Sequence, residues 1–187
     1  MFKEERRTAL SLKVKSNQKL SMLVVVSLAL LATVLSSCSN AEDLTLIKEE
    51  SNNRVAVAAV HVAAVGLGEV IKGMDEDQQI EAIRQFIDPI RFFGDESGYF
   101  YVYDFNCINI AHAIDKTLPG QNLSDYQDMR GMFVIRELSA AAQNGNGFVT
   151  YYWPHPETQQ EQKKVGYVEP IPGTNYFIGT GYYPDAE

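Results

Sequence analysis

The chain has 187 residues, of which 45% are hydrophobic and 21% charged, and its formal net charge at pH 7 is −8. The first 37 residues hold 6 of the 16 basic residues and 2 of the 24 acidic ones, so the remaining 150 residues carry a net charge of −12. That length allows one domain with one core. So acidic a surface repels nucleic acid and anionic lipid headgroups, which excludes both as partners.

The N-terminus has the pattern of an export signal. A basic leader precedes an apolar run over residues 20–35, shorter than the roughly 20 apolar residues of a membrane-spanning helix. The run ends in Leu-Ser-Ser-Cys38, which resembles the lipobox of bacterial lipoproteins, where the leader is cut before the cysteine and the thiol carries a diacylglycerol. We therefore expect a lipoprotein signal peptide at 1–37 and a lipidated tether at 38–43; a signal anchor with a coincidental cysteine is the alternative. Ser39, in place of a retaining aspartate, favours the periplasmic face of the outer membrane.

One long helix is predicted over residues 44–72. The segment lacks turn residues, and its alanines favour a helix over the strand that its valines suggest. Because it is apolar almost all round, we expect it to be buried, either in the domain or in a dimer. We also expect it to be too short to cross a bilayer and to carry His61 as a hydrogen-bonded core residue.

A second helix is predicted over residues 77–87, after Gly73 ends the first, with Asp75 or Asp77 as its cap. A loop at 115–126 precedes a third helix, which Asp128 would cap and which would run from residue 129 to about 143. Aromatic-rich strands are predicted at residues 99–104, 108–113, 148–153, 163–169 and 176–183. Five antiparallel strands with helices packed on one side make a PAS-like α+β domain.

Cys107 falls in the turn between the first two strands, where a cysteine at positive φ would be strained by about 1 kcal/mol; a turn of another type is the alternative. With Cys38 lipidated it has no intramolecular disulfide partner, and we expect it at an exposed tip. His112 is five residues away, but no oxyanion-hole glycine loop accompanies the two, so we predict no enzymatic activity and keep a redox-sensing thiol as the alternative. The spacing of histidines and acidic residues predicts neither a metal site nor another cofactor.

Strand parity indicates which residues share a face. Tyr151 and Trp153 lie on one face of the third strand. Gly179 and Gly181 share a face of the fifth, which either leaves room for a ligand or another backbone or simply allows a helix to pack closely there. Both readings stay open.

Two cations are candidates for contact with an anion. Parity places Lys164 opposite Tyr167, so only one of them can face a pocket unless a bulge intervenes. Arg130 would lie in the first turn of its helix, an unfavourable place for a cation unless it and the helix N–H groups converge on an anion. A surface pair of Arg130 with Asp125 or Asp128 is the alternative.

A series of spaced motifs resembles, in order, a single Cache domain of the second type, the extracytoplasmic sensor module of bacterial chemoreceptors and histidine kinases. The motifs lie at residues 98–104 (Gly-Tyr-Phe-Tyr-Val-Tyr-Asp), 110–112, 118–122, 128–131, 151–154 (Tyr-Tyr-Trp-Pro), 164–168 and 178–183. The resemblance covers residues 44–187. The chain departs from the family at Cys107, where glycine is usual.

The resemblance implies a small organic ligand, often a short carboxylate, between the sheet and the loop and helix that follow the second strand. In such a site Arg130 or Lys164 would neutralise the carboxylate and Tyr151 would donate a hydrogen bond to it. Trp153 would pack against the apolar part of the ligand. The matching positions are His112, Tyr126, Arg130, Tyr151, Trp153, Lys164 and Tyr167.

The chain ends four residues after the last predicted strand, with no second signalling segment in the sequence. We therefore expect a lipid-anchored binding protein that senses a small molecule and reports to a membrane-bound signalling or transport partner. The alternative is a structural or accessory periplasmic lipoprotein without a dedicated small ligand.

Overall fold

The computed structural model describes residues 42–184, so the predicted signal peptide and Cys38 lie outside the described residues. The chain divides into two compact units, residues 1–48 and 49–187. In the first unit the described residues are helical, as part of a helix that runs from Glu42 to Val70. The last two residues of the predicted tether, 42 and 43, are therefore already helical. The sheet, the remaining helices and every contact described below belong to the second unit.

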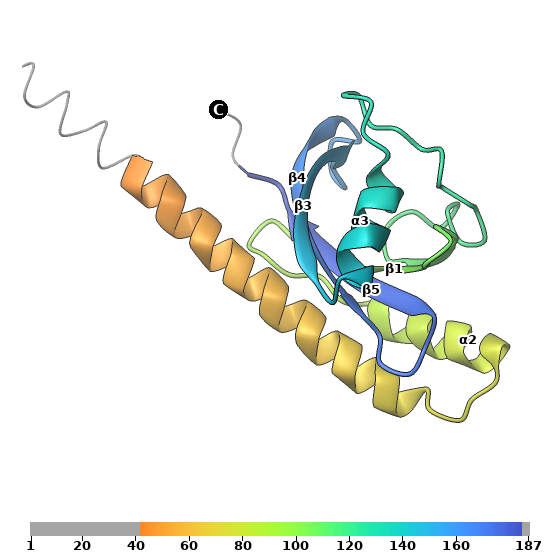
Figure 1. The fold of residues 1–187 in the computed structure, drawn as a ribbon. Coiled ribbons are helices and arrows are strands. Elements are labelled where there is room, and N and C mark those ends of the chain that lie inside the picture. The colour runs from red at the N-terminus through yellow and green to blue at the C-terminus, as the bar shows by residue number, and fades with distance from the viewer. Residues whose placement is uncertain (1–41, 185–187) are drawn as a thin grey trace, which may run out of the picture. The chain divides into compact units, whose positions relative to one another are not determined.

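A five-stranded antiparallel sheet forms the centre of the second unit (Figure 1), which confirms the predicted fold class. Every residue of β5 is buried, because the strand lies in the middle of the sheet with helices on both sides. The strands are β1 (Tyr101–Asp104), β2 (Asn109–His112), β3 (Gly147–Pro154), β4 (Glu161–Pro170) and β5 (Tyr176–Tyr182), and their order is β2-β1-β5-β4-β3.

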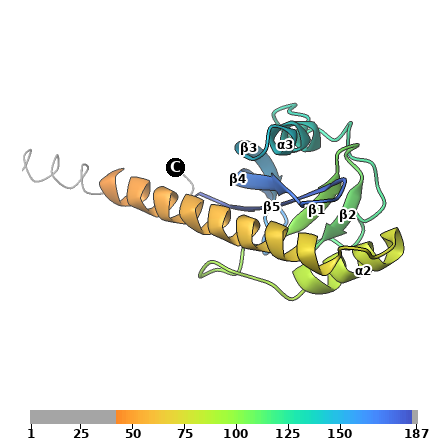
Figure 2. The same ribbon diagram turned by 60° about the horizontal axis from the view of Figure 1, so that its bottom comes forward.

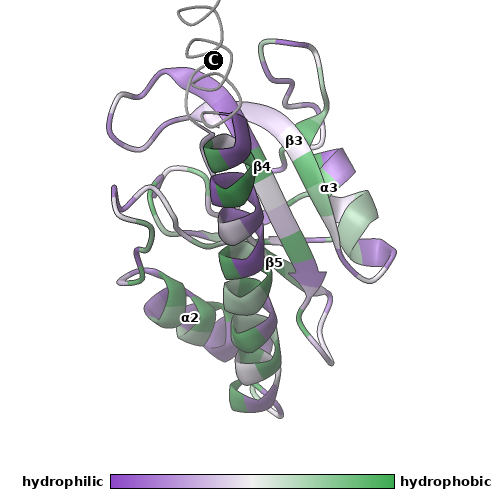
Figure 3. Ribbon diagram, turned by 90° about the vertical axis from the view of Figure 1, so that its left-hand side faces the viewer, coloured by the Kyte–Doolittle hydropathy of each residue, from purple (hydrophilic) through white to green (hydrophobic). Residues whose placement is uncertain are grey.

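The N-terminal helix buries one stripe against the sheet. Its buried residues recur at three- and four-residue spacing, as expected for one face of a helix: Ala56, Val60, Ala63, Ala64 and Leu67. The other side remains exposed, with Val62 at 71% exposure, and Figure 3 shows hydrophobic segments recurring along the helix in front of the sheet. Within the described residues, the apolar surface of this helix is thus only partly covered by the domain.

Two expectations about this helix are wrong. His61 is not in the core: its side chain is 64% exposed, and its Nδ1 lies 3.0 Å from Oε2 of Glu169. Nor is the helix too short for a bilayer, because its 29 residues are long and apolar enough to cross one and would extend about 43 Å. One third of the residues in its most apolar window are buried.

Helix α2 (Glu76–Ile87) begins at a capping box. The carboxylate of Asp75 accepts a hydrogen bond from the backbone N–H of Gln78 at 2.9 Å, and the Gln78 side chain accepts one from the Asp75 N–H. Asp75, one of the two predicted caps, is therefore the cap. In Figure 2, α2 and the N-terminal helix lie on one side of the sheet and α3 (Val134–Gln143) lies on the other. The helices thus cover both faces, not one.

Helix α3 begins five residues later than predicted. The Asp128 carboxylate accepts hydrogen bonds from the backbone N–H groups of Arg130 and Met132, at 2.9 and 3.0 Å. Gly131 has φ +82°, which a helix cannot contain. Asp128 therefore caps a turn, and the helix starts only at Val134.

The backbone at Cys107 has φ +67°, so of the two alternatives the turn with a strained cysteine is the one present. Its expected exposure is wrong, since Cys107 is buried at 6% exposure. The N–H of Leu123 donates to the Cys107 carbonyl at 2.9 Å, so the loop after β2 folds back over the tip of the hairpin. Burial raises the pKa of the Cys107 thiol.

Candidate functional site

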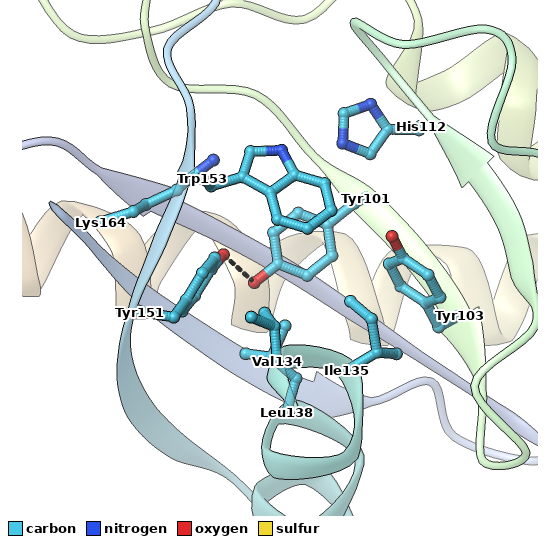
Figure 4. Close-up of a pocket in the computed structure, with 9 residues that line it drawn as sticks. All are labelled: Tyr101, Tyr103, His112, Val134, Ile135, Leu138, Tyr151, Trp153 and Lys164. Carbon is cyan, nitrogen blue, oxygen red and sulfur yellow. Dashed lines mark hydrogen bonds between the residues drawn. The ribbon is translucent and has the colours of Figure 1, made fainter. Parts of the chain in front are cut away.

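A small cavity lies between the sheet and α3 (Figure 4). Aromatic and polar side chains from the sheet face aliphatic side chains from the helix, and the residues are Tyr101, Tyr103, His112, Val134, Ile135, Leu138, Tyr151, Trp153 and Lys164. The free space among them is about 10 Å³, close to the volume that one water occupies. It adjoins a larger hollow of about 690 Å³, and His112 and Trp153 line both spaces.

Strand register brings these side chains together. Tyr101 pairs with His112 across β1 and β2, and Tyr151 pairs with Lys164 across β3 and β4. Paired residues point to the same face of an antiparallel sheet, as do residues two apart on one strand. The predicted shared face of Tyr151 and Trp153 is therefore the face that lines the cavity.

Glycines opposite the tyrosines make this arrangement possible. A Cβ on Gly179 would lie 2.5 Å from the Tyr101 ring, and one on Gly166 would lie 2.8 Å from the Tyr151 ring. A Cβ on Gly181 would meet Cε of Lys164 at 3.0 Å and a backbone carbonyl at 2.5 Å. The Tyr101 ring thus fills the space above Gly179, and neighbouring backbone together with the Lys164 side chain fills the space above Gly181.

Lys164 is the cation of this cavity. Its side chain is fully buried, and its Nζ makes no hydrogen bond with any described group. Aromatic rings surround the amine: the Nζ lies 3.8 Å from the centroid of Tyr99, 4.9 Å from Tyr183 and 5.8 Å from Tyr101. Burial lowers the pKa of Lys164 well below its ordinary value. A buried amine without a hydrogen-bond partner is costly, so an acidic or anionic group that binds beside it would be strongly favoured.

His112 is held as a neutral ring. Its Nδ1 accepts a hydrogen bond from the backbone N–H of Asp115 at 2.8 Å, which leaves the proton on Nε2. Burial, and next the nearby Lys164, lower the pKa of His112 to about 3. The ring lies 6.1 Å from Trp153, centroid to centroid. His112 can therefore offer one N–H donor at neutral pH.

Tyr151 and Tyr101 form a buried pair of phenols. The Tyr151 hydroxyl donates to the Tyr101 hydroxyl across 3.3 Å, and burial raises the pKa of both. Tyr103, further along the same face of β1, has a buried hydroxyl that makes no hydrogen bond with a described group. The cavity thus offers neutral phenols as hydrogen-bond donors beside the amine.

Tyr126 belongs to the outer hollow. Its ring stands edge-on to Trp153, with the centroids 5.1 Å apart, and its hydroxyl is 3.4 Å from Oε1 of Glu161. Burial, and next the charge of Glu161, raise the pKa of Tyr126 to about 12. Tyr126 supports Trp153 from outside and does not line the inner cavity.

The structure does not bring Arg130 to the cavity. Because Asp128 caps a turn there, Arg130 is exposed, and its guanidinium carbon lies 5.1 Å from the centroid of Tyr152. Its Nη2 is 3.3 Å from the Tyr152 hydroxyl. The expectations that Arg130 lies in the first turn of a helix and that it is the cation of the cavity are therefore both wrong.

Tyr167 is also placed elsewhere. The pairing of β3 with β4 runs without a bulge through this region, so Tyr167 points away from the face that Lys164 occupies. Its hydroxyl donates to Oε1 of Glu169 at 2.9 Å, and its ring packs on Phe148 with the centroids 4.7 Å apart. Strand parity correctly indicated that Tyr167 and Lys164 cannot both face the cavity, whereas the family resemblance placed both of them there.

Sequence reasoning missed part of the lining. Tyr101 and Tyr103 alternate along β1 and share the cavity face, a period-two signal that was present in the sequence. Val134, Ile135 and Leu138 come from α3. Their spacing of three and four residues is a helical-face signal that was likewise present in the sequence.

Comparison with known proteins identifies the domain. Residues 40–187 match the family model of the Cache domain. The sensor histidine kinase MctS of Rhizobium johnstonii is 36% identical over 116 residues, which are 60% of this chain and 24% of the kinase, so the chain spans about a quarter of that relative.

Two solved structures share the fold. A methyl-accepting chemotaxis protein from Vibrio parahaemolyticus is 28% identical with a TM-score of 0.68, covering 75% of this chain and 94% of its own. A Cache chemosensory domain, solved to explain carboxylic acid recognition, is 27% identical with a TM-score of 0.64, covering 77% and 98%. With the family match over most of its length, the chain belongs to the Cache domain family.

Proposed function

We propose that this chain is an extracytoplasmic sensor that binds a short organic carboxylate beside Lys164 and performs no chemistry on it. The observation that carries the proposal is the fully buried Nζ of Lys164, which has no acceptor among the described residues. An unsatisfied buried amine is costly, by about 1–3 kcal/mol, and a carboxylate is the group that would satisfy it best. Recognition of carboxylic acids by a similar Cache domain supports the same ligand class.

The surrounding side chains suit a short chain with one polar end. Neutral Tyr101, Tyr151 and His112 supply hydrogen-bond donors near the amine, and α3 supplies an aliphatic wall. Small-molecule sites generally combine an apolar lining with a few polar groups that fix orientation. Because the inner space is now about 10 Å³, entry of a ligand requires Trp153 or the α3 side chains to move apart.

A panel of small molecules tests the proposal on residues 39–187. Solved relatives that match over 94% and 98% of their length are of this domain alone, which indicates that it folds by itself. Acetate, propionate, butyrate and succinate are compared with propionamide, 1-propanol and propylamine in thermal unfolding. A ligand at 100 times its Kd adds about 2.7 kcal/mol to the free energy of unfolding.

Lys164→Met and Lys163→Met form the matched pair of variants. Lys163 precedes Lys164 on β4 and is exposed. Loss of a desolvated ion pair should weaken carboxylate binding by about 2–5 kcal/mol in Lys164→Met, and Lys163→Met should bind as the wild type does. Stabilisation by no carboxylate at millimolar concentration would instead support the structural or accessory role.

We also propose that the protein is anchored by lipid at Cys38 on the periplasmic face of the envelope and reports to a membrane-bound partner. The support is the apolar run that ends in Leu-Ser-Ser-Cys38 and the match to part of a sensor histidine kinase. Cys38→Ser should abolish incorporation of radiolabelled palmitate. Equal labelling of the variant and the wild type would exclude the anchor without affecting the ligand proposal.

A further inference from the structure

Within residues 42–184, no counter-charge lies beside Lys164. From β1 and the residues before it, Tyr101 and Tyr99 face the amine; Tyr151 faces it from β3, and Tyr183 from the end of β5. Tyr103 on β1 and His112 on β2 complete the titratable groups of the cavity, and α3 contributes only aliphatic side chains. Among the described residues, no carboxylate lies within ion-pair distance of the Lys164 Nζ.

None of these neighbours supplies a negative charge at neutral pH. Burial raises the pKa of Tyr99, Tyr101, Tyr103, Tyr151 and Tyr183, so all five phenols stay protonated. His112 is neutral, because its pKa is lowered to about 3. In the described part of the chain, the groups that favour an ammonium ion here are the faces of the aromatic rings, of which Tyr99 lies nearest.

The balance between burial and the rings decides the charge of the amine. A lysine buried without a counter-ion loses its hydration, and such burial can displace a lysine pKa by several units. Ring faces attract a cation, but a ring at 3.8 Å and two more distant ones replace only part of the lost hydration. The cavity without ligand therefore holds Lys164 as the uncharged amine.

We infer that a carboxylate enters this cavity together with one proton, which the amine of Lys164 takes up as the ion pair forms. The carboxylate arrives as an anion, one proton comes from the solvent, and the product is an ammonium–carboxylate pair with no net charge. Each charge stabilises the other, so the pair avoids both an isolated ammonium and an isolated carboxylate in a desolvated site. The net event equals uptake of the neutral acid.

This coupling makes the sensor respond to acidity as well as to ligand concentration. Where Lys164 is uncharged in the empty protein and charged in the complex, the affinity for the carboxylate rises up to tenfold for each unit by which pH falls. The rise ends where either the amine of the empty protein or the ligand's own carboxyl group begins to protonate. The inference rests on the proposed carboxylate site and adds a property that carboxylate binding alone does not require.

Calorimetry in two buffers tests the inference directly. Propionate is titrated into residues 39–187 at pH 7.5 in phosphate and in Tris, whose ionisation enthalpies differ strongly. The difference in observed binding enthalpy gives the number of protons taken up, and we expect about one per propionate. The same titration at pH 6.5 and 8.5 should show the affinity falling as pH rises, up to tenfold per unit.

Variants identify the acceptor of the proton. Lys163→Met should retain an uptake of about one proton, since its side chain is exposed outside the cavity. His112→Gln removes the other titratable nitrogen of the cavity; the proton count should stay near one whatever the change in affinity.

The outcomes separate the inference from the proposed function. Binding of propionate with no proton uptake and with an affinity independent of pH would overturn the inference and leave the carboxylate site standing. Loss of the uptake in His112→Gln would assign the proton to the histidine, and so overturn the role of Lys164. If no member of the carboxylate panel binds, the proposed function fails and the inference fails with it.

Discussion

The two faces of the central sheet differ in how many of their buried polar side-chain atoms have a hydrogen-bond partner. Toward the N-terminal helix, side chains such as Val60 and Leu67 are buried in apolar contact. Toward α3, the strands carry all the buried side-chain atoms that lack a hydrogen bond among the described residues, and these belong to Tyr103, Asn109 and Lys164. One face stabilises the domain, and the other retains costly polar groups, as functional sites commonly do.

The largest expected effect lies on the helix face. Leu67→Ala should lower the free energy of unfolding by about 2–5 kcal/mol, because Leu67 is 2% exposed and its loss leaves a cavity. Val62→Ala, on the same helix at 71% exposure, should change it by less than about 0.5 kcal/mol. Urea unfolding measures both. Similar losses in the two variants would show that the outward side of the helix is also buried, by contacts outside this chain.

The next largest effect on stability is expected from substituting a glycine that faces the cavity. Gly179→Ala should lower the free energy of unfolding by about 1–3 kcal/mol and weaken carboxylate binding, because the new Cβ would lie 2.5 Å from the Tyr101 ring. Gly66→Ala is the control: nothing lies within 4 Å of its Cβ position in the N-terminal helix, so it should stabilise by about 0.5–1 kcal/mol. Thermal unfolding with and without propionate distinguishes them. An unaltered Gly179→Ala would show that the tyrosine face is loosely packed.

A smaller effect appears in the pH dependence of stability without ligand. The pKa of Lys164 is lowered in the folded protein and close to 10.4 in the unfolded chain. Between these values the unfolded chain holds a proton that the folded protein lacks. The free energy of unfolding therefore rises with pH, by up to about 1.4 kcal/mol per unit, and the contribution levels off above the unfolded value.

Subtracting Lys164→Met isolates this contribution. The wild type should gain stability relative to the variant between pH 8.5 and 9.5, as measured by urea unfolding, while other lysines and tyrosines cancel in the difference. Parallel pH profiles would mean that Lys164 is charged in the empty cavity.

The smallest test concerns Cys107 in the β1–β2 turn. Because it is buried and its thiol pKa is raised, the folded protein should react with a maleimide about tenfold or more slowly than the urea-unfolded chain. Reaction at the unfolded rate would revive the redox-sensing alternative, which requires an accessible thiolate.

Local sequence signals predicted the features that depend on neighbouring residues. The helix cap at Asp75, one of two predicted candidates, and the shared face of Tyr151 and Trp153 follow from patterns within a few residues. Such patterns survive folding when no distant contact competes with them.

The errors arose where a distant segment intervenes. Asp128 does not begin a helix, because its carboxylate also accepts a hydrogen bond from the N–H of Tyr152, 24 residues later. Cys107 is buried because the loop at Leu123 returns over it. The choice between Arg130 and Lys164 as the pocket cation depended on the first of these contacts, and no local pattern contains it.

A crystal structure of residues 39–187 grown with propionate tests the central claim most directly. The account predicts a carboxylate oxygen within about 2.7–3.2 Å of the Lys164 Nζ, with its alkyl chain toward α3 and Trp153 displaced from its present position. A propionate seated on the exposed Arg130, or an unchanged inner cavity in crystals of a protein that binds propionate in solution, would contradict it.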